Sequence, residues 1–387
     1  MDKVRFGVIG MGNMGLPHAR NIVGAQSEEF CLGAICEIDK EKGRKVAQEL
    51  GVPNFRKFQD MYDSGLVNAV IVAVPHYWHP VMTIAAARKG LQVMCEKPLA
   101  VTVGKARMMI EECKKHNVAL GAMLQQRTRP SMRKMKQMVA GGEVGEVFRV
   151  SMICSNWFRS QAYYDSGAWR GTWDGEGGGV LINQAPHSLD LFQWIGGMPK
   201  RIHAVISTRE HTIEVEDAAN AICEYERGKI GYIYATTAEE PGMEQIMVCG
   251  NNGTLINEGG KLKFGKLAMP LPDHIYKSTE GFGQQKCEWQ EVEAAKTPEG
   301  HLEVLRAFVA HLLHGQPMIA TGEEAINELE LSNAIYVAGF RNKVVDLPVD
   351  AKEIEKLIAR LERERSTGRG GGLRRKAQAQ LRKLGVG

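Results

Sequence analysis

The chain contains 387 residues, of which 44% are apolar and 24% are charged, a composition typical of a globular protein with two or three domains. No apolar stretch approaches the roughly 20 residues that span a bilayer, and the N-terminus leads directly into a strand-like segment. A membrane protein and a cleaved signal peptide are therefore not expected. Eight scattered cysteines without a Cys-x-x-Cys pair favour free thiols in a reducing cytoplasm over disulfides or a metal site.

The net charge of +4 is concentrated at the C-terminus, where residues 366–387 carry six basic and no acidic side chains. The remainder is close to neutral, so a nucleic-acid-binding surface would have to lie in this tail. The run from Gly370 to Gly372 predicts a flexible start, and residues 373–384 could form a short basic helix. We expect a solvated tail or an oligomer contact, and no binding to nucleic acid.

Residues 4–9 form an apolar strand that leads into the turn Gly10-Met11-Gly12-Asn13-Met14-Gly15 and then into a helix. In this context Gly10 permits the tight turn, Gly12 lets a pyrophosphate approach the backbone, and Gly15 lets the helix pack closely on the strand. The free amides at the helix start, with Asn13 and Met14 beside them, would bind the phosphates of a dinucleotide. A purely structural glycine turn is the alternative.

The second strand, residues 31–36, ends in Glu37, at the distance from the glycines where an acidic side chain accepts the ribose hydroxyls of an adenosine. A carboxylate here would repel a 2′-phosphate, and the neighbouring Ile38 supplies no cation. The position therefore favours NAD over NADP as the cofactor. A solvated loop acid is the alternative interpretation of Glu37.

Apolar strands then alternate with amphipathic helices up to residue 125, which predicts a parallel sheet covered on both faces. The expected helices are residues 40–50, 80–89 and 102–116, and the expected strands are residues 68–74, 91–95 and 119–124. Ligands bind such sheets at the carboxyl ends of the strands. The side chains expected at those ends, facing the cofactor, are Pro75, His76, His79, Glu96, Lys97 and Gln125. Either histidine could instead be a general base or a packing residue.

Glu96 and Lys97 close the apolar strand and precede Pro98, which cannot continue the hydrogen-bond ladder and fixes the backbone there. A buried lysine at this edge needs a partner for its amine. A cofactor lying across the strand ends would place Lys97 beside it.

After residue 126 the strands become longer and more amphipathic, which predicts a mostly antiparallel sheet with one open face in a second α/β domain of residues 126–350. The expected strands are residues 146–153, 201–208, 218–225, 229–236 and 245–250. An open face needs covering, and a homo-oligomer, dimer or tetramer, would bury it between subunits. Residues 351–387 would form a C-terminal helix and the basic flexible tail.

A dense cluster of aromatic and polar residues lies between the first two strands of this domain. It comprises Trp157, Arg159, Tyr163, Tyr164, Trp169, Arg170 and Trp173. Flat apolar rings among hydrogen-bonding groups suit a sugar-like polyol, for which we assign Arg159, Tyr163, Tyr164 and Trp173 as binding residues. A structural loop or a subunit contact is the alternative.

A glycine triplet, residues 177–179, leads from this cluster to a helix that begins near Pro186 and brings His187 and Asp190 to its first turn. Asn183 would share a face with His187 if the helix extended back that far, but Pro186 disfavours helical geometry in the residue before it.

These motifs together resemble the glucose-fructose oxidoreductase / inositol dehydrogenase / rhizopine-catabolism (Gfo/Idh/MocA) family up to about residue 350. The resemblance is carried by the glycine turn, Glu96-Lys97-Pro98-Leu99-Ala100, Arg127-x-x-Pro130 before Gly142-x-x-Gly145, Trp169-Arg170, the triple glycine and His187-x-x-Asp190. It implies a Rossmann domain followed by an α/β domain on a large open sheet, a nicotinamide cofactor that Trp169 and Arg170 help to bind, and hydride transfer at a secondary alcohol of a sugar or cyclitol.

The resemblance also implies that Lys97 and His187 are the catalytic pair. Many members carry Asp where this chain has Asn183, and an amide cannot take up a proton, so Asn183, with Asp190, is assigned to substrate binding. We favour His187 as the proton acceptor, since its pKa would need little tuning, and Lys97 as the group that polarises the oxygen. A glycosidase with tightly bound NAD and a non-catalytic sensor remain alternatives.

Overall fold

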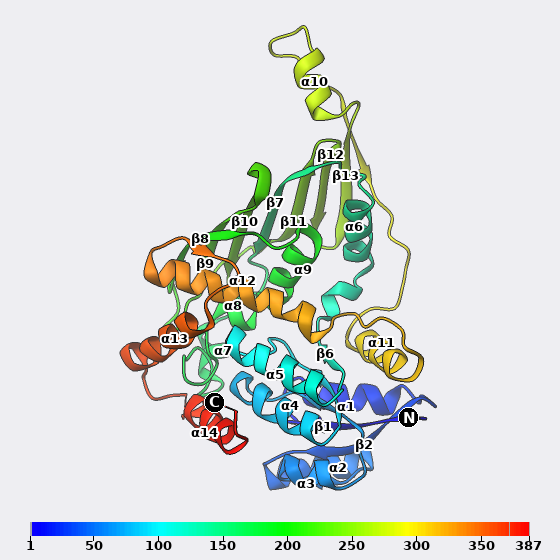
Figure 1. The fold of residues 1–387 in the computed structure, drawn as a ribbon, viewed down its shortest axis with the longest axis vertical. Helices are drawn as coiled ribbons and strands as arrows, with labels where there is room; N and C mark the ends of the chain where they lie inside the picture. Colours follow the sequence, from blue (N-terminus) through cyan, green and yellow to red (C-terminus); the bar gives the residue numbers. More distant parts are fainter. Residues whose placement is uncertain (1, 371, 387) are drawn as a thin grey trace.

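The computed structural model describes residues 2–370 and 372–386, and the chain folds around two sheets (Figure 1). The first sheet is parallel, in the order β3-β2-β1-β4-β5-β6, which is that of a Rossmann dinucleotide-binding sheet. Its strands are β1 (Val4–Ile9), β2 (Phe30–Cys36), β3 (Asn54–Phe55), β4 (Ala69–Val72), β5 (Gln92–Cys95) and β6 (Leu120–Ala122).

Helices connect these strands and cover the sheet. They are α1 (Gly15–Gly24), α2 (Lys40–Leu50), α3 (Phe58–Asp63), α4 (His79–Arg88) and α5 (Val103–Lys115), with short 3-10 turns η1 (His76–Trp78) and η2 (Gln125–Thr128). The predicted alternation of strands and helices is confirmed. Every residue of β4 is buried, as expected for a strand that is covered on both faces of the sheet. The short elements β3 and α3 were not predicted, since two and six residues carry too little periodicity.

The second sheet has nine strands in the order β14-β13-β12-β11-β7-β10-β9-β8-β15, and every neighbouring pair except β7 and β10 is antiparallel. The five predicted strands are present as β7 (Val147–Cys154), β8 (Arg201–Ser207), β9 (Ala218–Glu224), β10 (Ile230–Thr236) and β11 (Glu244–Gly250). The four strands without a prediction are β12 (Gly253–Glu258), β13 (Lys261–Leu267), β14 (Cys287–Glu291) and β15 (Val345–Asp346). The mostly antiparallel sheet is thus confirmed and is larger than expected.

Helices cover one face of this sheet, and the other face is open (Figure 1). The covering helices are α6 (Pro130–Ala140), α8 (Val180–Asn183), α9 (Pro186–Gly196) and α12 (Gly322–Arg341). On the open face Val205, Ile222 and Tyr232 remain exposed on three adjacent strands. The remaining elements are α7 (Gln161–Asp165), η3 (Glu226–Gly228), α11 (His301–His314), and α10 (Leu271–Lys277) at the tip of a projecting arm.

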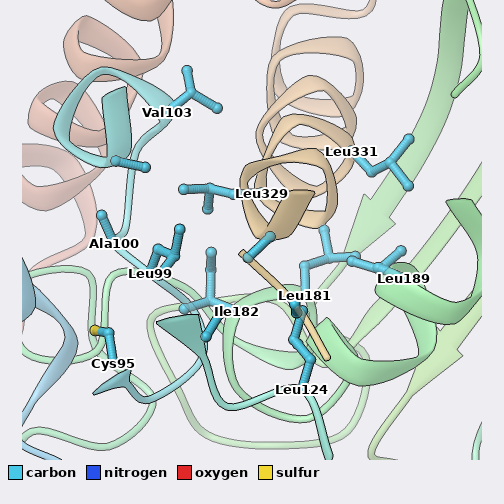
Figure 2. Close-up of a cluster of buried hydrophobic side chains, with 14 of the residues drawn as sticks. Cys95, Leu99, Ala100, Val103, Leu124, Leu181, Ile182, Leu189, Leu329 and Leu331 are labelled. Atoms are coloured by element: carbon cyan, nitrogen blue, oxygen red, sulfur yellow. The ribbon is translucent and has the colours of Figure 1, made fainter. Parts of the chain in front are cut away.

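A shared apolar core joins the two sheets. Figure 2 shows Leu99 and Ala100, just after β5, beside Ile182 of α8 and Leu329 of α12. These buried side chains lie directly next to the segments that carry Lys97 and His187, so the core holds those segments in place. One apolar core spans both sheets, so it does not mark where one domain ends and the next begins. The domain boundaries at residues 125 and 350 therefore stay predictions.

The basic tail does not have the solvated form that we expected. After α13 (Ala351–Arg365), helix α14 (Leu373–Lys383) packs on α4 and η1, with Ala377 and Leu381 buried. Arg374 forms an ion pair with Glu362 of α13, and its backbone N–H donates to the Asp174 carbonyl over 3.0 Å. The physical reason is that α14 is amphipathic, so its apolar stripe is buried although its outer face is basic.

The described residues, 2–370 and 372–386, contain no helix long and apolar enough to cross a bilayer. The eight cysteines are free, and six of them are buried.

Candidate active site

The glycine turn between β1 and α1 has the geometry that a dinucleotide requires. Gly10 adopts φ +85°, where a Cβ would lie 2.4 Å from the Ala73 carbonyl oxygen, and a Cβ on Gly15 would lie 1.7 Å from the Gly10 oxygen. A Cβ on Gly12, by contrast, would meet no atom within 4 Å. Gly12, Asn13 and Met14 are exposed, which leaves the start of α1 open to a phosphate.

Glu37 lies at the carboxyl end of β2, beside this turn. Its carboxylate accepts hydrogen bonds of 3.0 Å from the backbone N–H groups of Met11 and Asp39. Lys42 Nζ lies 3.6 Å from the same carboxylate, so a cation is present although Ile38 supplies none. The side chain is therefore held at the turn, as an acceptor for ribose hydroxyls requires.

Lys97 lies just beyond the end of β5, and its Nζ donates a 2.6 Å hydrogen bond to the main-chain carbonyl of Asn183. Burial lowers the pKa of Lys97 from its ordinary value, although nearby carboxyls, Glu96 first among them, act to raise it. Burial would also raise the pKa of Glu96, but a 2.6 Å hydrogen bond from His18 and the charge of Lys97 outweigh it and bring this pKa to about 2. Glu96 is thus a fixed negative charge next to the lysine.

His187 lies in the first turn of α9, almost fully buried. Its Nε2 is 3.1 Å from Gln125 Nε2, at the end of β6, and an amide N–H in that position donates to the imidazole. Its Nδ1 has no hydrogen-bond partner in the described part of the chain. Burial and the charge of Lys97 lower the pKa of His187 to about 3, so our expectation that its pKa needs little tuning is wrong.

Asn183 ends α8 and connects Lys97 to Glu176 and Tyr163. Besides accepting from Lys97, it donates its side-chain amide to the carboxyl of Glu176 and, over 3.2 Å, to the hydroxyl of Tyr163. Lys97, Asn183, His187 and Gln125 therefore lie in one region where the carboxyl ends of β5 and β6 face α8 and α9.

Two family models match the chain. One, described as an oxidoreductase family with an NAD-binding Rossmann fold, matches residues 4–123, and the other, described as the GFO/IDH/MocA C-terminal domain, matches residues 132–256. The chain belongs to the Gfo/Idh/MocA oxidoreductase family. Membership confirms the fold class and the NAD-binding first domain that the glycine turn and Glu37 predicted.

Relatives in this family include myo-inositol 2-dehydrogenase of Thermotoga maritima, 24% identical over 342 residues that cover 86% of this chain and 95% of that protein. The rhizopine catabolism protein MocA of Rhizobium meliloti is 26% identical over 246 residues, which cover 62% of this chain and 74% of that protein.

Among solved structures, the WlbA dehydrogenase from Bordetella pertussis in complex with NADH and UDP-GlcNAcA has a TM-score of 0.78 and 27% identity. The match covers 90% of this chain and 99% of that one. A levoglucosan dehydrogenase in complex with NADH and levoglucosan shares the fold, with a TM-score of 0.74 at 19% identity over 89% of this chain and all of that one.

Two further candidate residues of this Gfo/Idh/MocA chain, Arg159 and Arg170, lie close to the ring of Tyr163. Their guanidinium carbons lie 4.8 and 4.3 Å from the ring centroid, and Arg170 also lies 4.6 Å from the Trp169 ring. Neither arginine forms an ion pair with another described residue, and Arg159 Nε is buried without a partner. Arg159 donates to the Phe158 carbonyl over 2.8 Å and Arg170 to the Tyr163 hydroxyl, so both cations are held beside the half-exposed ring of Tyr163.

His76 and His79 have different surroundings. His76 Nδ1 lies 2.9 Å from the Glu176 carbonyl, and burial lowers the pKa of His76 to about 3. Both ring nitrogens of His79 lie 2.8 Å from backbone carbonyls, those of Pro98 and Val74, so His79 connects two strand ends and has no nitrogen for a cofactor. Pro75 precedes η1 and is half-buried.

Three residues assigned to substrate binding are instead structural. Trp173 is fully buried against Tyr336 and Phe340. Its indole N–H donates to the Glu214 carbonyl inside the core, so the side chain does not face a ligand. Tyr164 is buried, with its hydroxyl 2.9 Å from that of Thr237.

Asp190 is the third of these residues, and it forms a buried two-point ion pair with Arg127, at 2.7 and 2.8 Å. With both carboxylate oxygens occupied by the guanidinium, Asp190 fixes η2 against α9 and does not face a ligand.

Two buried acids near Lys97 were not predicted. Glu176 lies within the glycine-rich run before α8, and Glu328 lies on α12. Burial raises the pKa of Glu176 to about 7 and the pKa of Glu328 well above its ordinary value. The only local signal was an acidic residue inside the run Gly175-Glu176-Gly177, which is also typical of a solvated loop.

Proposed function

We propose that this protein is an NAD-dependent dehydrogenase that acts on a ring secondary alcohol of a sugar, glycoside or cyclitol. The observation that supports this most directly is the 2.6 Å contact from Lys97 to Asn183, because it places the amine between the NAD-binding sheet and the segment of His187. The substrates named for the relatives, inositol and anhydro- or nucleotide sugars, are of the same polyol class.

Bound NAD supplies the hydride acceptor, and the residues of this chain handle the hydroxyl proton. A base whose conjugate acid has a pKa of about 3 holds a proton poorly, which argues against His187 as the acceptor. Lys97 starts from a much higher pKa that burial lowers, so its neutral amine is the better acceptor. We therefore assign proton transfer to Lys97 and orientation of the hydroxyl to the unpartnered Nδ1 of His187.

Part of the predicted sugar platform supports the same assignment. Tyr163 presents a half-exposed ring, Asn183 an amide, and Arg159 a guanidinium with an unpartnered Nε. A stacked ring with several hydrogen-bonding groups around it is suited to a polyhydroxylated ring. Tyr163, Asn183 and Arg159 are the substrate-binding residues that we retain.

The test is NADH formation by the purified protein with NAD and a panel of free sugars, glycosides and inositols. We expect at least one polyol to give steady NADH accumulation, and Tyr163→Ala to raise its KM. Failure of every polyol in the panel, with NADH binding intact, would overturn the dehydrogenase assignment.

A glycosidase that uses tightly bound NAD is the second candidate, because the same Lys97 and His187 would serve a transient oxidation. It would release the aglycone of a glycoside without net NADH. A non-catalytic sensor would bind NAD and sugar with neither product. Measurement of aglycone and NADH in the same reaction separates the three functions.

We further propose a cytoplasmic homo-oligomer that pairs through the open face of the second sheet. Free thiols fit a reducing compartment. Val205 on β8, Ile222 on β9 and Tyr232 on β10 are 71%, 44% and 42% exposed, and Tyr232 lies directly opposite Ile222. Light scattering should show more than one subunit, and Tyr232→Lys together with Ile222→Lys should lower the mass.

A further inference from the structure

We propose that Glu176 is a positioning residue of the active site, whose carboxyl holds the side chain of Asn183 and stabilises the ammonium form of Lys97. This inference rests on the proposed function, because it concerns the group to which we assign proton transfer. Position 183 carries an amide, which cannot bear a charge, so a carboxylate in contact with Asn183 has to come from another segment.

The carboxyl of Glu176 is fixed from several directions. Its Oε2 accepts a 2.7 Å hydrogen bond from the Gly171 N–H, and its Oε1 accepts the side-chain amide of Asn183. The main-chain carbonyl of Glu176 lies 2.9 Å from His76 Nδ1. The side chain is 1% exposed, so water cannot compete for these contacts.

The glycines around Glu176 permit this burial. Gly177 adopts φ +89°, and a Cβ there would lie 2.5 Å from Val101 of the first domain. The loop is thus pressed against the NAD-binding half of the protein, which brings an acid of the second half close to Lys97.

Asn183 connects Glu176 to Lys97. Its side chain donates to the Glu176 carboxyl, and its main-chain carbonyl accepts the Lys97 amine at 2.6 Å. When Lys97 takes the proton of a substrate hydroxyl, an ammonium forms, and a nearby carboxylate lowers the free energy of that charge. The carboxylate of Glu176 accordingly acts to raise the pKa of Lys97 against the effect of burial.

The charged and titratable groups around this pair come from several elements. Those that face Glu176 are Arg170 and Lys97, which stabilise its charge, and the hydroxyls of Tyr163, Tyr164 and Tyr336. Those that face Lys97 are Glu96, Glu328, Glu176 and Arg159. His76, His79, His187 and His301 also lie near Lys97, and burial together with its charge lowers the pKa of each of these histidines. Burial outweighs the stabilising contacts and raises the pKa of Glu176 to about 7, so its charge changes near neutral pH, whereas that of Glu96 does not.

Glu216 provides a matched control. It is equally buried, burial raises its pKa to about 7, and it accepts hydrogen bonds from the Gly179 and Leu181 N–H groups and from the Tyr336 hydroxyl. Within the described residues its carboxyl contacts neither Asn183 nor Lys97. Glu216→Gln therefore removes a buried carboxyl from the same region without removing the proposed one.

The experiment measures the pKa of Lys97 from the pH dependence of its acetylation by acetic anhydride, read by mass spectrometry in the full-length protein. We expect Glu176→Gln to lower this pKa by about one unit, a tenfold shift, and Glu216→Gln to leave it unchanged. Glu176→Asp, which retains a carboxyl, should restore part of the shift. Equal pKa values of Lys97 in the wild type and in Glu176→Gln would overturn the proposal.

The unmodified protein gives a second test that needs no folded variant. Acetylation of Lys97 should show an additional inflection near pH 7 as Glu176 ionises, and a single inflection would overturn the proposal. NADH binding and NADH formation by the wild type are measured separately. Their absence would contradict the proposed function, whereas the Lys97 titration would still decide the role of Glu176.

Discussion

The amine of Lys97 lies 2.6 Å from the main-chain carbonyl of Asn183, although the two residues are 86 positions apart. Lys97 follows β5 of the NAD-binding sheet, and Asn183 ends α8 of the second half. Through this contact the strand-end lysine lies beside the segment that carries His187, four residues beyond Asn183. The candidate active site is therefore formed where the helices on the second sheet pack against the NAD-binding half of the protein.

Lys97→Met should remove the proposed proton acceptor while keeping a similar side-chain volume. We expect NADH formation to fall by about a hundredfold to ten-thousandfold, the range typical of general acid–base groups. NADH affinity, followed by fluorescence, should change little. Lys89→Met, at a half-exposed lysine on the surface, is the control. Retention of near-normal turnover by Lys97→Met would contradict the assignment.

His187 should remain neutral throughout the physiological range. Because burial and Lys97 lower its pKa to about 3, its imidazole resonances should not shift between about pH 5 and pH 8 in nuclear magnetic resonance spectra. Spectra of His187→Gln identify the signals. A titration near the ordinary histidine pKa would show that the ring is solvated, and would return it to consideration as the base.

The buried carboxyls of Glu176 and Glu216 should make the protein less stable as the pH rises. Burial raises both folded-state pKa values from 4.5 to about 7, so this stability is present below about pH 4.5 and is lost as the pH passes 7. Each group contributes up to about 3 kcal/mol to this fall in the free energy of unfolding.

Urea unfolding at about pH 5 and pH 8 measures that fall. In Glu216→Gln the difference between the two pH values should shrink by up to about 3 kcal/mol, since one of the two titrating groups is gone. An undiminished difference would mean that Glu216 is ionised at both pH values.

Glu37→Ala should weaken NAD binding by roughly tenfold to a hundredfold. Hydrogen bonds to a charged acceptor contribute about 1.5–3 kcal/mol, and the substitution removes those from the ribose hydroxyls. The same substitution frees the Met11 and Asp39 amides. Glu41→Ala, on the exposed side of α2, should leave the affinity unchanged. Isothermal titration calorimetry decides, and equal affinity of Glu37→Ala and wild type would contradict the ribose assignment.

Arg374 and Arg375 test the docked tail as a matched pair. Both approach Glu362, but the Arg374 side chain is 10% exposed and that of Arg375 is 78% exposed. Arg374→Ala leaves the partly buried carboxylate of Glu362 without its partner in the ion pair, and should therefore increase hydrogen exchange throughout α14. Arg375→Ala should exchange like the wild type. Equal exchange in the two variants would indicate that the ion pair does not hold α14.

The elements that repeat a local pattern were predictable. β1, α2 and the glycine turn follow from periodicity and from glycine geometry, and Lys97 from a strand that ends at a proline. The roles of Trp173 and Asp190 were not predictable, because an indole and a carboxylate look alike in sequence whether a core or a ligand surrounds them. Trp173 lies among Tyr336 and Phe340, and Asp190 pairs with Arg127, in each case tens to more than a hundred positions away.

The sequence by itself determined the family, the NAD-binding turn, Glu37 and the candidate pair of Lys97 and His187, because each is a short motif whose chemistry depends on its immediate neighbours. Only the tertiary structure decided which of these groups carries a proton at neutral pH. A pKa depends on burial and on charges brought close by packing, and this packing buries His187 and joins Glu176 to Asn183 beside Lys97. The docking of α14 was decided in the same way, since an amphipathic helix is buried only where another surface receives it.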